Sequence, residues 1–189
     1  MNKPVLKYAS FWQRAWAALL DFLILFPLGL LSLWGFFNFK NYFLFAIPIS
    51  LAISFLYSIC LVKWLGGTLG KLLIGIIITK PDGSPVGWRE AILRPIVDIT
   101  FSLLVSTAFF AASSKISFVD YSALSQLGRL EALMMNLPLW HRPIDILQNV
   151  WVWADLIAVL TNRKRRSLRD RIAGTIVIDR NVSLNELEN

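Results

Sequence analysis

The sequence contains little of what most catalytic and metal sites are made from. Its 189 residues include one cysteine, Cys60, and one histidine, His141. A single cysteine excludes an internal disulfide and a cysteine-based metal cluster. His141 falls in an expected loop with no partnered nucleophile, so neither a zinc site nor a Ser-His-Asp triad is supported. We therefore expect no cofactor, no metal site and no enzymatic activity.

Charge is scarce as well. Only 16% of the residues are charged, whereas 56% are hydrophobic, and the mean hydropathy is +0.59. A soluble domain of this length exposes far more charge, so the sequence predicts an integral membrane protein with one small membrane domain over residues 1–189. Much of the net charge of +7 comes from residues 163–171, directly after the last apolar segment. This is typical of a cytoplasmic membrane edge, and no element that would read a nucleic acid is visible.

Four apolar segments have a length suited to crossing a bilayer, which takes about 20 helical residues. We expect helices over residues 11–33, 42–63, 90–112 and 146–161, the last of which spans only with local thinning or snorkelling flanks. Lys3, Lys7 and the basic residues after 161 place both termini in the cytoplasm, in a bacterial inner membrane. The first segment is too long for a cleavable signal peptide and lacks a small-residue cleavage site.

Shorter patterns complete the expected fold. Residues 76–79 and 174–178 are β-branched runs on the cytoplasmic side, and we expect them to pair into a small sheet. Residues 113–145 form the longest polar interval, with an amphipathic helix on the outer surface whose simplest role is a packing lid. Its apolar positions are Leu124, Leu127, Leu130, Met134 and Leu137. The predicted class is an all-α membrane protein with about four transmembrane helices, a small cytoplasmic β element and an outer amphipathic helix.

Three aspartates lie within the apolar segments: Asp21, Asp98 and Asp155. A charge inside a bilayer costs on the order of 2.5–3.5 kcal/mol on insertion scales, and it rarely persists without a partner or a task. At about 1.5 Å per residue, all three lie roughly 10–15 Å from the cytoplasmic face. Arg14 and Arg94 lie nearer the interface, so the five charges are candidates for one buried network.

Two interpretations of these charges stay open. In the structural one, Arg14 pairs with Asp21 and Arg94 pairs with Asp98, and the pairs hold the helices in register. The protein is then a non-catalytic module that binds or scaffolds another membrane protein. In the functional one, two arginines leave one of three carboxylates unmatched, and that group carries a proton or binds a small cation. Four helices are few for a transport path, so we expect a homo-oligomer or a larger partner.

Several of these residues also resemble a known pattern. Residues 67–75, which include Lys71, look like the glycine-rich element of the RDD family of bacterial membrane proteins. Residues 89–94 resemble the stretch that leads into the next helix of that family, and residues 166–178 are similar to its closing pattern. The arginine and two aspartates that give the family its name match Arg14, Asp21 and Asp170.

The resemblance implies a multi-spanning inner-membrane protein that transports an undefined ligand, with cation/proton exchange as one proposed activity. It covers most of the chain, but residues 113–145 look like an insertion outside the family pattern. Asp170, Gly174 and Thr175 belong to the closing pattern. From the residues alone Asp170 is a solvated charge among arginines; the resemblance implies that it locks the C-terminal element against Arg14 or Lys71, or guards a cytoplasmic opening.

Overall fold

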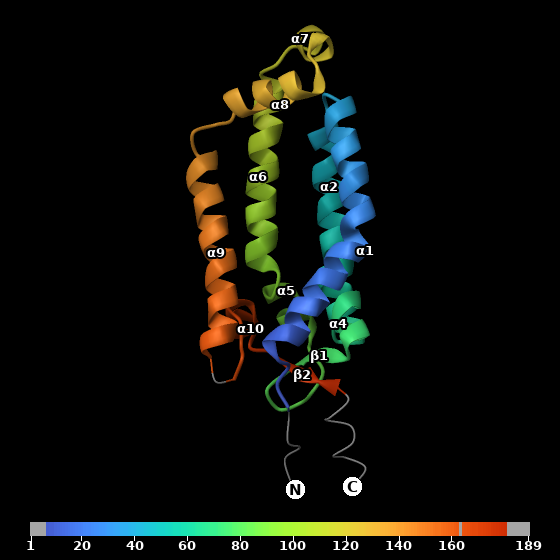
Figure 1. Cartoon of the computed structure of the whole chain (residues 1–189), viewed down its shortest axis with the longest axis vertical. Helices are drawn as coiled ribbons and strands as arrows, with labels where there is room; N and C mark the ends of the chain where they lie inside the picture. The colour runs from blue at the N-terminus through green and yellow to red at the C-terminus, as the bar shows by residue number, and fades with distance from the viewer. Residues whose placement is uncertain (1–6, 163, 181–189) are drawn as a thin grey trace, which may run out of the picture. The chain divides into compact units, whose positions relative to one another are not determined.

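The computed structural model describes residues 7–162 and 164–180, and most of them are helical (Figure 1). Within this part of the chain, four helices are long and apolar enough to cross a membrane. They are α1 (Phe11–Asn38), the continuous helix formed by α2 (Tyr42–Ser54), η1 (Phe55–Cys60) and α3 (Leu61–Leu65), α6 (Ile96–Ser114) and α9 (His141–Thr161). The predicted class is confirmed. Lys3 and Arg163, used above to place the termini, lie outside the described residues.

Short elements connect these helices, and the chain divides into two compact units. The short elements are α4 (Leu69–Ile74), β1 (Ile76–Thr79), α5 (Trp88–Leu93), α7 (Phe118–Ala123), α8 (Gln126–Met135), α10 (Leu168–Ala173) and β2 (Ile176–Asp179). The first unit contains residues 1–25, 53–97 and 151–189, and the second contains residues 26–52 and 98–150. Each of the four long helices thus contributes residues to both units.

Helix boundaries differ from the expected ones at two prolines. The single helix expected over residues 90–112 is wrong, because the structure divides it into α5 and α6 at Arg94 and Pro95. Proline has no N–H to donate, and its ring clashes with the carbonyl four residues earlier. The expected loop position of His141 is also wrong, since His141 is the first residue of α9. Pro143 lies in the first turn, where a missing N–H is tolerated, so the helix begins ahead of the apolar run.

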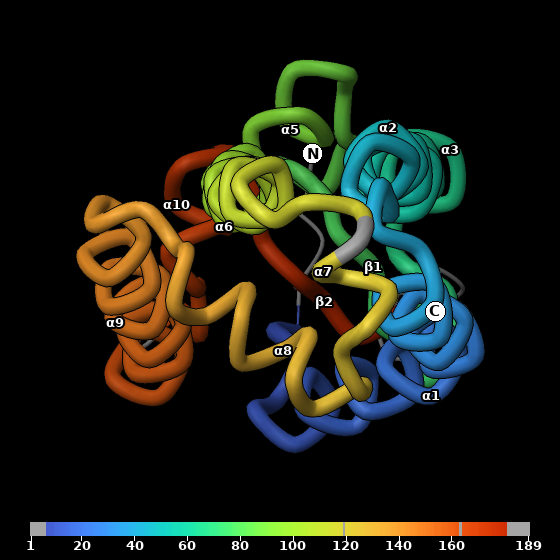
Figure 2. Tube along the Cα trace, turned by 90° about the horizontal axis from the view of Figure 1, so that it is seen from above, coloured from blue at the N-terminus to red at the C-terminus, as the bar shows by residue number. Residues whose placement is uncertain are grey.

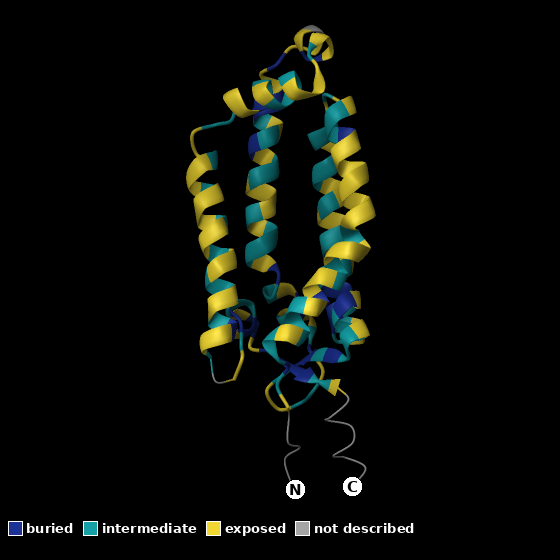
Figure 3. Cartoon of the chain, viewed as in Figure 1, coloured by how far each residue is buried: buried dark blue, intermediate teal, exposed yellow. Residues whose placement is uncertain are grey.

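The predicted sheet is confirmed and forms the core of the first unit. β1 and β2 pair antiparallel, with Ile77 opposite Ile178. The segment before α1 joins the same sheet, because the N–H of Ala9 donates to the carbonyl of Val177 at 3.0 Å. Most side chains of both strands are buried, and those of Ile76 and Val177 are fully buried (Figure 3). The beginning and the end of the described chain are therefore hydrogen-bonded to each other.

The long helices present apolar side chains on their exposed surfaces. Exposed large side chains occur on every one of them, for example Phe22 on α1, Leu56 on η1, Leu104 on α6 and Ile157 on α9 (Figure 3). Such continuous apolar exposure is unfavourable in water and is what a helix needs against lipid hydrocarbon.

The polar interval forms two helices of the second unit, α7 and α8, drawn in yellow in Figure 2. The predicted amphipathic helix is present as α8, with Leu127 (77% exposed) and Met134 (50% exposed) on its exposed side and Leu133 (1% exposed) on its packed side. The spacing runs across a helix boundary, since Leu124 lies before α8 begins. Leu133 packs in a buried cluster with Ala112, Ile116 and Tyr121. The hydroxyl of Tyr121 donates to the carbonyl of Phe36 at 3.0 Å.

Candidate functional site

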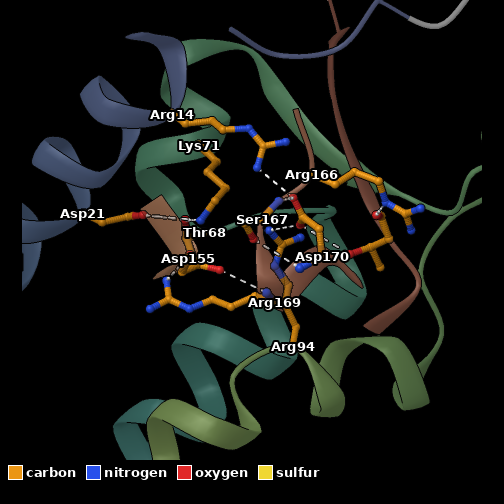
Figure 4. Close-up of polar contacts among 11 residues, drawn as sticks. Arg14, Asp21, Thr68, Lys71, Arg94, Asp155, Arg166, Ser167, Arg169 and Asp170 are labelled. Carbon is orange, nitrogen blue, oxygen red and sulfur yellow. Dashed lines mark hydrogen bonds and ion pairs between the residues drawn. The ribbon is translucent and has the colours of Figure 1, made fainter. Parts of the chain in front are cut away.

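Three aspartates of the first unit each contact at least one cationic side chain, and we call this set the charged cluster (Figure 4). The aspartates are Asp21, Asp155 and Asp170, and the cations are Arg14, Lys71, Arg94 and Arg169. They come from α1, α4, the end of α5, α9 and α10. Segments far apart in the sequence thus supply one group of charges.

Asp170 holds two arginines at once. Its Oδ2 lies 2.8 Å from Nη1 of Arg14, and its Oδ1 lies 2.6 Å from Nη2 of Arg94. The backbone of α10 positions the carboxylate, because Ser167 and Asp170 form a capping box at the start of that helix. Asp170 is fully buried. The expectation from the residues alone, a solvated charge, is therefore wrong, and the lock against Arg14 that the resemblance implied is present.

Opposing effects act on the carboxyl of Asp170. Burial raises its pKa, but the guanidiniums of Arg94 and Arg14 and the hydrogen bonds from Arg14 and Ser167 lower it, and the net result is a pKa below the usual range. The carboxylate is therefore charged at neutral pH. Gly174 and Thr175 support the same site: Gly174 ends α10 at a φ of 68°, and the Thr175 hydroxyl lies 3.5 Å from Oδ1 of Asp170.

Asp21 accepts three hydrogen bonds and forms one longer ion pair. The hydroxyls of Tyr57 and Thr68 each donate to it at 2.6 Å, and the N–H of Gly70 donates at 2.7 Å. Nζ of Lys71 lies 3.9 Å from Oδ2. Tyr57 belongs to the π-helical stretch η1, a local widening of the helix that is frequent at functional sites. The carboxylate of Asp21 is thus enclosed by hydroxyls, a backbone amide and an ammonium.

The contact between α4 and α1 depends on the absence of a side chain at Gly70. A Cβ atom there would lie 2.2 Å from the carbonyl oxygen of Ala17 and 2.7 Å from the backbone nitrogen of Asp21. Real Cβ atoms do not approach backbone this closely, so only glycine fits between the two helices. The close approach brings the N–H of Gly70 to the carboxylate of Asp21.

The ammonium of Lys71 has a perturbed pKa. Its pKa is lowered to about 8, first because the side chain is buried and next because Arg94 repels the ammonium. Asp21 and Asp170 act in the opposite direction, and Arg169 adds to the lowering. Nζ also donates to the hydroxyl of Thr68 at 3.1 Å. A lysine in this setting loses its proton in mildly alkaline conditions.

Asp155 lines a cavity of the first unit. The backbone N–H of Arg169 donates to Asp155 at 3.0 Å, and the guanidinium of Arg169 lies 3.8 Å from the other carboxylate oxygen. The cavity has a volume of about 460 Å³. Its polar lining consists of Arg14, Lys71, Arg94, Asp155, Ser167 and Arg169, and the remainder is almost wholly apolar.

The expected pairing of Arg14 with Asp21 is wrong. Arg14 contacts Asp170 rather than Asp21, and Arg94 contacts Asp170 as well. Asp98 lies in the first turn of α6 and belongs to the second unit. The balance also differs from the expected surplus of carboxylate, since four cations of the charged cluster meet three aspartates. Among the described residues, no group of three histidine, cysteine, aspartate or glutamate side chains is placed to hold a metal ion.

Sequence reasoning missed four members of the site: Tyr57, Thr68, Gly70 and Arg169. Thr68 and Gly70 lie in the glycine-rich element, where a threonine two residues before a glycine was a usable signal. Tyr57 was visible as a hydroxyl inside an apolar segment. Nothing in the sequence distinguishes Arg169 from its basic neighbours, because the distinction arises from the direction of α10.

Comparison with known proteins identifies the family of this chain. The RDD family matches residues 8–174. YteJ, an uncharacterized membrane protein of Bacillus subtilis, is 29% identical over 133 residues, which cover 61% of this chain and 77% of YteJ. YckC of the same organism is 42% identical over 107 residues, which cover 52% of this chain and 68% of YckC. No solved structure matches. The chain belongs to the RDD family and is a multi-spanning membrane protein.

Proposed function

We propose that this protein exchanges protons for a small cation across the membrane, with Asp21 and Lys71 as the exchanging pair. The observation that carries the proposal is the 3.9 Å separation of Lys71 Nζ and Asp21 Oδ2 in a site that also contains two hydroxyls. Carboxylate and hydroxyl oxygens are the kind of ligand that hard cations prefer. Sodium and potassium are the candidate cations.

Competition for the carboxylate would couple the two ions. When Lys71 is protonated, its ammonium compensates the charge of Asp21, so the site attracts a second cation only weakly. When Lys71 loses its proton, the charge of Asp21 is free to attract a cation together with the oxygens of Tyr57 and Thr68. The pKa of about 8 for Lys71 supports this scheme, because the proton then leaves within the physiological range.

The proposed setting is the bacterial inner membrane, with both termini in the cytoplasm. Lys7 and the basic residues 164–171 favour that orientation. Because four helices are few for a path, a homo-oligomer or a larger membrane-protein partner would complete it. We expect no enzymatic activity.

A second candidate is a membrane module that binds or scaffolds another membrane protein. Asp170 is fully buried and bound by Arg14 and Arg94, which favours this interpretation. Such an ion-pair network holds the segments in a fixed position and leaves no unpaired carboxylate at Asp170. This candidate predicts that the purified protein moves no ions.

Ion flux in liposomes separates the two candidates. The full-length protein is reconstituted with a pH-sensitive dye inside, and sodium or potassium gradients are imposed. Cation-driven proton movement that is lost in Asp21→Asn and retained in Asp145→Asn, an exposed aspartate of α9, supports exchange at Asp21. Folded wild-type protein that gives no flux above empty liposomes overturns exchange and favours the scaffold.

A further inference from the structure

We propose that the cavity of the first unit binds the phosphate group of an anionic phospholipid. The proposal concerns the cavity lined by Arg14, Arg94 and Arg169 and does not rest on cation exchange at Asp21. In the proposed complex the guanidiniums bind the phosphate anion, and the acyl chains of the lipid lie against the apolar part of the lining.

The charge of the lining favours an anion. Four of its side chains are cationic, namely Arg14, Lys71, Arg94 and Arg169, and one is a carboxylate, Asp155. That carboxylate already contacts Arg169. Three of these cations also contact Asp21 or Asp170, so the charged cluster as a whole carries one more positive than negative charge, and a phosphate would offset that surplus. Basic pockets between membrane helices are a recurring way to bind acidic lipid headgroups.

Unused hydrogen-bond donors of two lining arginines give a second, independent argument. Nε and Nη2 of Arg14 and Nη1 of Arg94 are buried and have no hydrogen-bond partner among the described residues. The side chain of Arg94 is only 10% exposed, so water has little access to it. A buried donor without an acceptor is costly, and guanidinium N–H groups match phosphate oxygens in geometry. A phosphate in the cavity would supply the missing acceptors.

The rest of the lining indicates where that phosphate comes from. Phe11, Ala15 and Ala18 of α1 and Val152, Leu156 and Val159 of α9 form its apolar part. Both helices are long and apolar enough to cross a membrane, so in a bilayer this wall would be within reach of lipid acyl chains. A free phosphate would gain nothing from the wall, whereas acyl chains would bury apolar area against it. The lipid headgroup is therefore favoured over the free ion.

Binding to the purified full-length protein in a neutral detergent, without ion gradients, tests the proposal. Three probes separate the contributions: dioctanoyl phosphatidylglycerol carries phosphate and chains, dioctanoylglycerol carries chains alone, and glycerol 3-phosphate carries phosphate alone. We expect phosphatidylglycerol to bind at least tenfold more tightly than either of the others. Because no ion movement is measured, failure of cation exchange would leave this result unchanged.

Matched variants locate the site. Arg169→Gln removes a charge from the cavity, and Arg171→Gln removes the same charge from an exposed position of the same helix α10 that does not line the cavity. We expect about a tenfold rise in Kd for phosphatidylglycerol in Arg169→Gln and no change in Arg171→Gln. Ala18→Phe fills the apolar part and should weaken phosphatidylglycerol while leaving glycerol 3-phosphate unaffected.

Three results would overturn the proposal. Equal binding of phosphatidylglycerol and dioctanoylglycerol would show that the phosphate is not recognised. Equal loss in Arg169→Gln and Arg171→Gln would show general charge attraction rather than a site. Binding of glycerol 3-phosphate as tight as that of phosphatidylglycerol, unchanged by Ala18→Phe, would identify a free phosphate as the ligand and exclude the lipid.

Discussion

Arg14 at the start of α1 and Asp170 in α10 are 2.8 Å apart between Nη1 and Oδ2, although 156 residues separate them in the sequence. Arg94 reaches the other oxygen of the same carboxylate at 2.6 Å. One buried negative charge thus joins three segments of the first unit. The stability of that unit should depend strongly on this carboxylate.

Replacing Asp170 should destabilise the protein severely. Asp170→Asn leaves the guanidiniums of Arg14 and Arg94 buried without a counter-charge, and removal of one partner from a buried ion pair costs about 3–5 kcal/mol. Thermal unfolding in detergent measures the effect, with the exposed Asp145→Asn as the control. Similar melting temperatures for the two variants would contradict the structural role given to Asp170.

Acid should remove the same stabilisation. The pKa of Asp170 is lowered in the folded protein, so its contribution is present above the unfolded pKa of about 3.9 and is lost as the pH falls through the folded value. The difference in the free energy of unfolding between wild type and Asp170→Asn should therefore be largest near pH 6 and should decrease below about pH 4. Unfolding measured at intervals between pH 3 and pH 7 tests this, and a gap independent of pH would refute it.

Lys71 should make stability rise at alkaline pH. Its pKa is about 8 in the folded protein against 10.5 when unperturbed, so between these values the unfolded state holds more protons and stability increases with pH. Relative to Lys71→Met, the wild type should gain up to about 3 kcal/mol as the pH rises from 7 to 10.5. The exposed Lys164→Met should show no such trend relative to the wild type. A flat difference for Lys71→Met would mean that the pKa is not lowered.

Gly70 should tolerate no side chain. A Cβ would meet the Ala17 carbonyl oxygen at 2.2 Å, so α4 must move away from α1 and lose the hydrogen bond to Asp21. Gly70→Ala should lower the free energy of unfolding by about 1–3 kcal/mol, the typical range for overpacking. Gly29→Ala is the matched control, because nothing lies within 4 Å of its Cβ position. It should be neutral or stabilising by up to about 1 kcal/mol, as helix propensity predicts. Equal stability of the two variants would exclude the tight contact.

Local patterns predicted the elements of this fold but not the partners of its charges. Length and hydropathy located the four long helices, and β-branched runs located the two strands. Pro95 was visible, yet whether a proline bends or interrupts a helix depends on the packing around it. The side of the sheet on which α10 lies is a tertiary property, so Asp170 looked solvated from its arginine neighbours. Its partners Arg14 and Arg94 belong to other segments, and only the resemblance to the RDD family connected Arg14 with it.

The order of synthesis gives the Asp170 contact a consequence for biogenesis. Arg14 and Arg94 are translated before Asp170, so they lack their shared carboxylate until α10 leaves the ribosome. Folding of the first unit is therefore completed only by its C-terminal segment. The sheet also forms late, since β2 follows α10 in the chain. We expect a nascent chain stopped before α10 to be a substrate for membrane quality-control proteases, whereas the chain that includes β2 escapes them.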